Sequence, residues 1–87
     1  MAIFGADIEQ VQQLSAQLNA KASDIENIIS QLSSAISSVT WMGPDAERFR
    51  SEWQGTHVAQ LKQVVSALQR ASQDAARNAR EQQSAST

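Results

Sequence analysis

The stretch that decides the fold is WMGPDAERFRSEW, Trp41 to Trp53, which holds three of the four aromatic residues and the only proline of the chain. Pro44 disfavours helical geometry in the residue before it, so a helix that arrives from the N-terminal side must end there. At the first position of a second helix Pro44 is well tolerated, and Asp45 and Glu47 then complement the positive end of the helix dipole. The stretch therefore predicts a turn at residues 41–43 between two helices.

Apolar residues before this turn recur at alternating spacings of three and four. The pattern predicts one long helix over about residues 7–40, with an apolar seam of the coiled-coil kind. The series is Ile8, Val11, Ser15, Leu18, Ala22, Ile25, Ile29, Leu32, Ile36 and Val39. Asp7 is either the N-cap, with Gln10 at capping-box spacing, or simply a residue of the first turn.

Apolar residues after the turn again follow helical spacing, which predicts a second helix over about residues 44–80. The series is Ala46, Phe49, Trp53, Val58, Leu61, Val64, Val65, Leu68, Ala71, Ala75 and Ala79. Gly55 interrupts it at a cost of roughly 1 kcal/mol relative to Ala, which a long helix tolerates. Three base and acid pairs spaced four apart, Arg48/Glu52, Arg70/Asp74 and Arg77/Glu81, predict weak surface ion pairs. Residues 81–87 have no apolar period, and we expect a flexible tail there.

The 87 residues predict a single all-α domain over residues 1–87, an antiparallel two-helix hairpin. Leu14, Ile28 and Ala35 widen the apolar stripe of the first helix beyond what one neighbour can cover. Because the chain has no cysteine and one histidine, neither disulfides nor metal can compensate for a small core, and we expect two hairpins to form a four-helix bundle. The expected dimer seam comprises Ile8, Val11, Leu18, Ile25, Ile29, Leu32, Ile36, Val58, Leu61, Val65 and Leu68.

Nothing in the sequence predicts catalysis, a metal site or a cofactor. His57 has no cysteine to join it, and the carboxylates are spread along a rod rather than gathered in a cleft. A net charge of -2 makes nucleic acid a poor partner. No apolar run is long enough to span a bilayer, so we expect no stable membrane insertion, and the first residues do not resemble a cleaved signal peptide.

The aromatic residues of the deciding stretch have different expected roles. Phe49 and Trp53 lie four apart on one helix face, which predicts core residues that fasten the second helix to the end of the first. Trp41 is either a structural plug, packed against its own chain, or a recognition knob, read by another protein. A tryptophan at a helix end can pack its ring while its N–H stays in contact with water, which suits both roles. Gly43 is expected to permit the tight turn before Pro44.

These residues together resemble the WXG family of small helical-hairpin proteins exported by type VII secretion systems. The resemblance covers about residues 8–79. It rests on Trp41-Met42-Gly43 at the only helix break, on Ala46, Phe49 and Trp53 after it, and on the aliphatic seam on both sides. Trp-x-Gly alone is a weak signal, and its position at the break is what makes it specific.

The resemblance implies a non-enzymatic protein that dimerises in the cytoplasm and is secreted, folded, by a membrane ATPase machine without a cleaved signal peptide. The partner is a second copy or another Trp-x-Gly protein. Trp41 and Gly43 then form one half of an export signal, and Pro44, Ala46, Phe49 and Trp53 support the turn. In the family the other half is a Tyr-x-x-x-Asp or Glu tail on the partner. This chain has no tyrosine, which indicates that another chain supplies the tail, although some members self-associate.

Two other functions stay open at this point. One is an adaptor or targeting chaperone for a larger type VII toxin. The other is a membrane-active effector that opens its hairpin, but helix faces rich in glutamine and serine predict weak attraction to anionic lipid.

Overall fold

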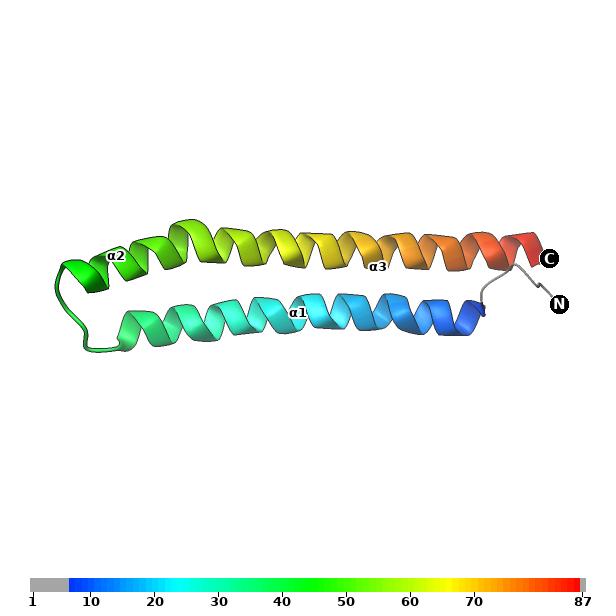
Figure 1. Ribbon diagram of the computed structural model, residues 1–87. Helices are drawn as coiled ribbons and strands as arrows, with labels where there is room; N and C mark the ends of the chain where they lie inside the picture. The colour runs from blue at the N-terminus through cyan, green and yellow to red at the C-terminus, as the bar shows by residue number, and fades with distance from the viewer. Residues whose placement is uncertain (1–6, 87) are drawn as a thin grey trace.

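The computed structural model is a helical hairpin, described here for residues 7–86 and for side chains up to residue 85. Helix α1 (Ile8–Ser38) is followed by α2 (Pro44–Glu52), a π-helical turn η1 (Trp53–His57) and α3 (Val58–Ser86). The second arm, α2 to α3, runs antiparallel to α1 in a rod of 65 × 17 × 16 Å (Figure 1). The all-helical hairpin predicted from the sequence is confirmed. Residues 1–6 and Thr87, which belong to the predicted domain and tail, lie outside the described residues.

Each arm begins at a residue that the sequence marks as a start. Asp7 is the N-cap of α1, and its Oδ1 accepts a hydrogen bond from the Gln10 N–H at 3.0 Å. Pro44 is the first residue of α2. The turn is longer than predicted, because α1 ends at Ser38 rather than near residue 40 and the connection takes residues 39–43.

The second arm is not one regular helix, as the sequence series suggested, but is interrupted by the π-helical turn η1 around Gly55. The Val58 N–H donates to the Trp53 carbonyl, five residues back rather than four. A π turn inserts one extra residue into the helical repeat. Trp53 and Val58, which are five apart in the sequence, can therefore both face α1.

The second arm also extends further than predicted. Helix α3 continues to Ser86, whereas a helix end near residue 80 and a tail over residues 81–87 were expected. Absence of an apolar period was the reason for that expectation. Arginine, glutamate, glutamine and alanine are good helix formers, so a helix that is already nucleated can propagate through them without burial.

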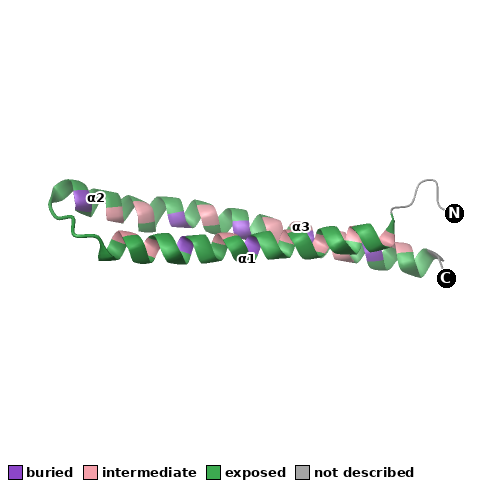
Figure 2. Ribbon diagram, turned by 90° about the horizontal axis from the view of Figure 1, so that it is seen from below, coloured by how far each residue is buried: buried purple, intermediate pink, exposed green. Residues whose placement is uncertain are grey.

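The core between the arms consists of a single row of buried residues in each long helix. Its buried positions recur every seven residues: Ala22 and Ile29 in α1, and Val58, Val65, Ser72 and Ala79 in α3. Figure 2 shows these buried positions separated by half-buried and exposed ones along both arms. No large side chain among the described residues is fully enclosed. The hairpin thus encloses one row of each helix and leaves the adjacent apolar rows partly open.

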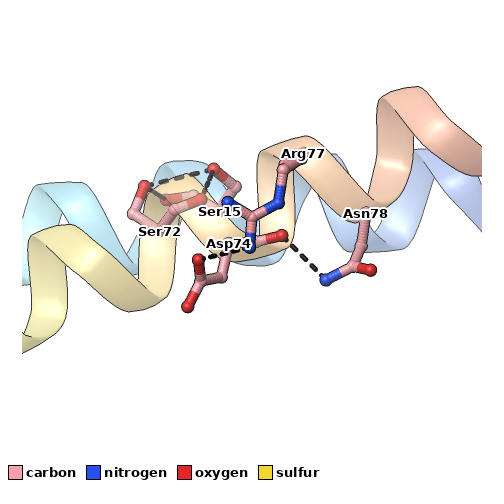
Figure 3. Close-up of polar contacts among 5 residues, drawn as sticks. All are labelled: Ser15, Ser72, Asp74, Arg77 and Asn78. Carbon is pink, nitrogen blue, oxygen red and sulfur yellow. Dashed lines mark hydrogen bonds and ion pairs between the residues drawn. The ribbon is translucent and has the colours of Figure 1, made fainter.

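A pair of serines crosses the core near the open end of the hairpin (Figure 3). The Ser15 Oγ lies 2.8 Å from the Ser72 carbonyl, the Ser72 Oγ lies 2.7 Å from the Ser15 carbonyl, and the two hydroxyl oxygens are 3.1 Å apart. Each hydroxyl therefore bonds the backbone of the opposite helix. Sliding one helix by a heptad would place these hydroxyls against apolar residues, so the pair favours the observed register.

The described residues form three ion pairs, and none of them is a pair predicted from the four-residue spacing. Arg48 and Arg77 contact Asp45 and Asp74, three residues earlier, and Lys21 contacts Asp24. Residues three apart share a helix face as well as residues four apart do. All six side chains are mostly exposed, so each pair contributes little to stability.

The serine crossing generates the first prediction. Ser72→Ala removes the hydroxyl and its cross-helix bonds, and we expect the free energy of unfolding to fall by about 1 kcal/mol. For a chain of this size that corresponds to a melting temperature lower by about 4–8 °C. Thermal unfolding followed by circular dichroism at fixed protein concentration measures it. Ser66→Ala, on the exposed surface of the same helix, is the control; equal effects of the two changes would contradict a role for the crossing.

Candidate recognition site at the helix break

The backbone of the break is shaped by Gly43 and Pro44. Gly43 has φ 113° and ψ 176°, a region that residues with a side chain rarely adopt. A Cβ at Gly43 would meet no atom within 4 Å, so the requirement for glycine comes from the backbone angle and not from crowding. The Gly43 carbonyl accepts the Glu47 N–H at 3.1 Å, which closes the first turn of α2. The turn-forming role predicted for Gly43 and Pro44 agrees with this geometry.

Arg50 of α2 joins the end of α1 to the turn. Its guanidinium donates three hydrogen bonds to main-chain carbonyls: Nε to Ile36 at 3.2 Å, Nη2 to Val39 at 3.1 Å and Nη1 to Trp41 at 2.9 Å. No sequence motif pointed to Arg50. A signal was present, since the last turn of α1 has neither a basic residue nor a C-terminal glycine to satisfy its free carbonyls.

Four exposed apolar residues, here called the tip cluster, lie in the break or in the helix turns beside it. The cluster consists of Val39, Trp41, Met42 and Phe49, with exposed fractions of 51%, 41%, 88% and 44%. The Trp41 and Phe49 rings contact each other, with centroids 5.4 Å apart and planes inclined by 56°. Such tilted ring pairs are favourable. The cluster therefore combines accessible apolar surface with a fixed ring position.

The inner side of the break holds Ala46 and Trp53. Ala46 is completely buried, and Trp53 is half-buried with its Nε1 donating to the Ser33 Oγ at 2.9 Å. The His57 ring lies 6.2 Å from the Trp53 ring, and His57 is exposed. The bond to Ser33 joins Trp53, and with it the second arm, to α1.

Phe49 does not occupy the core position expected for it. It is exposed and packs on Trp41 at the tip, while Trp53 faces α1. A helix advances 100° per residue, so residues four apart are offset by about 40° around it. At the end of a hairpin that offset is enough to move one of two such residues off the contact with the neighbouring helix.

A second candidate surface runs along one side of the rod. Next to the buried row lie residues of the predicted dimer seam that are half-buried, and beyond them lie exposed aliphatic residues. We call the lateral face the set Leu14, Leu18, Ile28 and Leu32 of α1 with Val64 and Leu68 of α3. Leu14, Ile28, Leu32 and Val64 are each between 44% and 49% exposed. Leu14, Leu18, Lys21 and Leu68 line an open groove of about 500 Å³ between the arms.

The residues of the predicted dimer seam differ in how far they are buried. Ile29, Val58 and Val65 are buried inside the hairpin itself. Leu32 is exposed. The others are half-buried, namely Ile8, Val11, Leu18, Ile25, Ile36, Leu61 and Leu68. A different groove between the arms, lined by Glu26, Lys62, Ser66 and Gln69 beside Ile29 and Val65, is polar at its rim. Apolar surface is thus concentrated on one side of the rod.

No group of three or more histidine, cysteine, aspartate or glutamate side chains in the described part of the chain is placed to hold a metal ion. Among residues 7–86, no helix has the combination of length and apolar character that crossing a bilayer requires. Comparisons with protein-family models, with curated proteins and with solved structures gave no significant match.

The different settings of Trp53 and Phe49 generate the second prediction. Trp53→Ala removes a half-buried ring and its hydrogen bond to Ser33, and we expect a loss of about 2–3 kcal/mol in unfolding free energy. Phe49→Ala removes an exposed ring, and we expect a loss below about 1 kcal/mol. Denaturant unfolding of both variants tests the difference. A Phe49→Ala loss equal to or larger than that of Trp53→Ala would show that Phe49 is a core residue after all.

Proposed function

We propose that this chain is a WXG-family protein, a non-enzymatic substrate of a type VII (ESX-like) secretion system that is exported as a folded helical dimer. The observation that carries the proposal is the setting of the Trp41-Met42-Gly43 motif. It lies at the break between the two arms, with the Trp41 ring accessible and Gly43 in a conformation suited to glycine. In this proposal the motif is part of the export signal and is read by the secretion-system membrane ATPase.

A recognition role for Trp41 is supported by how the ring is held. Phe49 contacts the ring, and Arg50 bonds the carbonyl of the same residue. Tryptophan contributes strongly to protein interfaces when a large ring is presented in a defined position, because little conformational freedom is then lost on binding. The plug interpretation of Trp41 requires a side chain enclosed by its own protein, and an exposed fraction of 41% for the residue favours the knob.

The proposed dimer is supported by the lateral face. A contiguous exposed apolar surface on a folded protein often marks an interaction site. Packing two hairpins through this face would enclose the half-buried rows of both and produce a four-helix bundle. The partner is a second copy or another Trp-x-Gly protein. In the second case that protein would supply the tyrosine-containing tail that this sequence lacks. Dimerisation in the cytoplasm would precede secretion.

The recognition role generates the third prediction. Trp41→Ala removes an exposed ring, so we expect the helical circular dichroism to be nearly unchanged while export is lost. Export is measured in the native host as the ratio of protein in the culture supernatant to protein in cells. Ser51→Ala, which changes an exposed residue of α2 outside the motif and the tip cluster, should be exported normally. Normal export of Trp41→Ala would show that Trp41 has a packing role only and is not part of the export signal.

The dimer generates the fourth prediction. Ile28→Glu places a carboxylate on the lateral face, and burying it unpaired in a dimer should cost about 3 kcal/mol or more, which is over roughly a hundredfold in Kd. We expect wild type to elute as a dimer, alone or with its partner, and the variant as a monomer, by size-exclusion chromatography with light scattering. Ser34→Glu, an exposed residue of the same helix, is the matched control. A variant that still dimerises would exclude this face.

A further inference from the structure

The three carbonyls that Arg50 binds belong to three successive parts of the chain. Ile36 is in the last turn of α1, Val39 is the residue after the helix, and Trp41 is in the turn. The last intrahelical bond of α1 is the one from the Val39 N–H to the Ala35 carbonyl at 3.1 Å. Carbonyls from Ile36 onward therefore have no partner within the helix, and one side chain from α2 satisfies two of them together with the turn.

The charge of Arg50 fits the same place. The carbonyl end of a helix carries a partial negative charge, which favours a cation there. Helix α1 has no basic residue in its last turn, and Arg50 supplies the cation from the other arm. None of the ion pairs in the described part of the chain uses Arg50, whereas Arg48, two residues earlier, is paired with Asp45 on the surface. Backbone carbonyls are thus the partners through which Arg50 acts.

Arginine is the residue type that this arrangement requires. Its planar guanidinium presents several N–H donors in a fixed fork, and Nε, Nη1 and Nη2 are each directed at a different carbonyl here. A lysine has one flexible ammonium group and cannot reproduce the same spread of donors.

We infer that Arg50 is the positioning residue of the recognition turn, holding the Trp41 backbone so that its ring is presented in one orientation. The inference rests on the proposed function, in which Trp41 is read by another protein. Phe49 and Arg50 are neighbours on α2, and they hold the ring and the carbonyl of the same tryptophan. Without Arg50 the turn samples other conformations, and the apparent affinity for Trp41 falls in proportion to the fraction of molecules that keep the competent one.

The test compares Arg50→Gln and Arg50→Lys with Arg48→Gln and Trp41→Ala in the full chain. Backbone ¹⁵N relaxation gives order parameters for residues 39–43, and export is measured on the same variants. In wild type we expect order parameters near about 0.85, as in rigid backbone, and in Arg50→Gln values below about 0.6 at residues 40–42. The middle of α1 and of α3 should keep wild-type values. Export should fall roughly tenfold if one molecule in ten keeps the competent turn.

Two matched comparisons separate positioning from general stability. Arg50→Lys keeps the charge and should recover part of the turn order and of export, and Arg48→Gln should change neither. If Arg50→Gln disturbs the whole hairpin, the result for Arg50→Lys decides the question. A loose turn and weakened export in Arg50→Lys, on an intact hairpin, support the inference. Wild-type order parameters and wild-type export in Arg50→Lys overturn it.

Other results would count against specific parts. Wild-type order at residues 40–42 in Arg50→Gln would overturn the inference. The inference would also be overturned if Arg50→Gln had a loosened turn but was exported fully while Trp41→Ala was not exported. Normal export of Trp41→Ala would instead overturn the proposed function, and the order parameters would then decide by themselves whether Arg50 positions Trp41.

Discussion

The constraint on which the rest of this structure depends is that each helix of a two-helix hairpin has one neighbour. One row of each helix can then be enclosed, and the buried residues of α1 and α3 repeat every seven positions for that reason. Several are small, such as Ala22 and Ala79, which lets the arms approach closely but encloses little apolar surface. The leucines lie beside this row and stay partly accessible. Surface available for association is therefore a direct consequence of the fold, and in the proposed dimer it becomes the centre of a four-helix bundle.

The break adds a second constraint, because the two arms must be both joined and aligned there. Pro44 and Gly43 set the path of the chain, and Arg50 joins the carbonyl end of α1 to the turn. The π-helical turn then shifts the phase of the second arm. Trp53 before it bonds Ser33, and Val58 after it is buried, although a regular helix would place residues five apart on different faces. The extra residue thus lets Trp53, before the π turn, and Val58, after it, both face α1.

Features that follow from local periodicity or from one special residue were predictable from the sequence. They include the all-helical hairpin, Pro44 at the start of α2 and the buried Ala46, and the Asp7 cap was one of two alternatives left open. Features that depend on contacts between segments were not. The Arg50 bonds require the end of α1 and the side of α2 to meet, and the exposure of Phe49 depends on where the hairpin ends. The five-residue spacing between Trp53 and Val58 is visible in the sequence, but only the π turn explains how both residues can face α1. The continuation of α3 beyond residue 80 is consistent with the helix propensity of its residues.

The positions of the two candidate surfaces have a consequence for how they can work together. The lateral face runs along α1 and α3, whereas the tip cluster lies at the break, where Phe49 contacts the Trp41 ring and Arg50 bonds its carbonyl. A partner packed along the lateral face would leave Trp41 accessible, so the proposed dimerisation and the proposed recognition of the turn would not compete for the same side chains. The lateral face presents a repeating surface, and the break is where backbone geometry departs from that repeat. A receptor that must distinguish this rod from other helical proteins would find the distinguishing geometry at the break, next to the exposed ring.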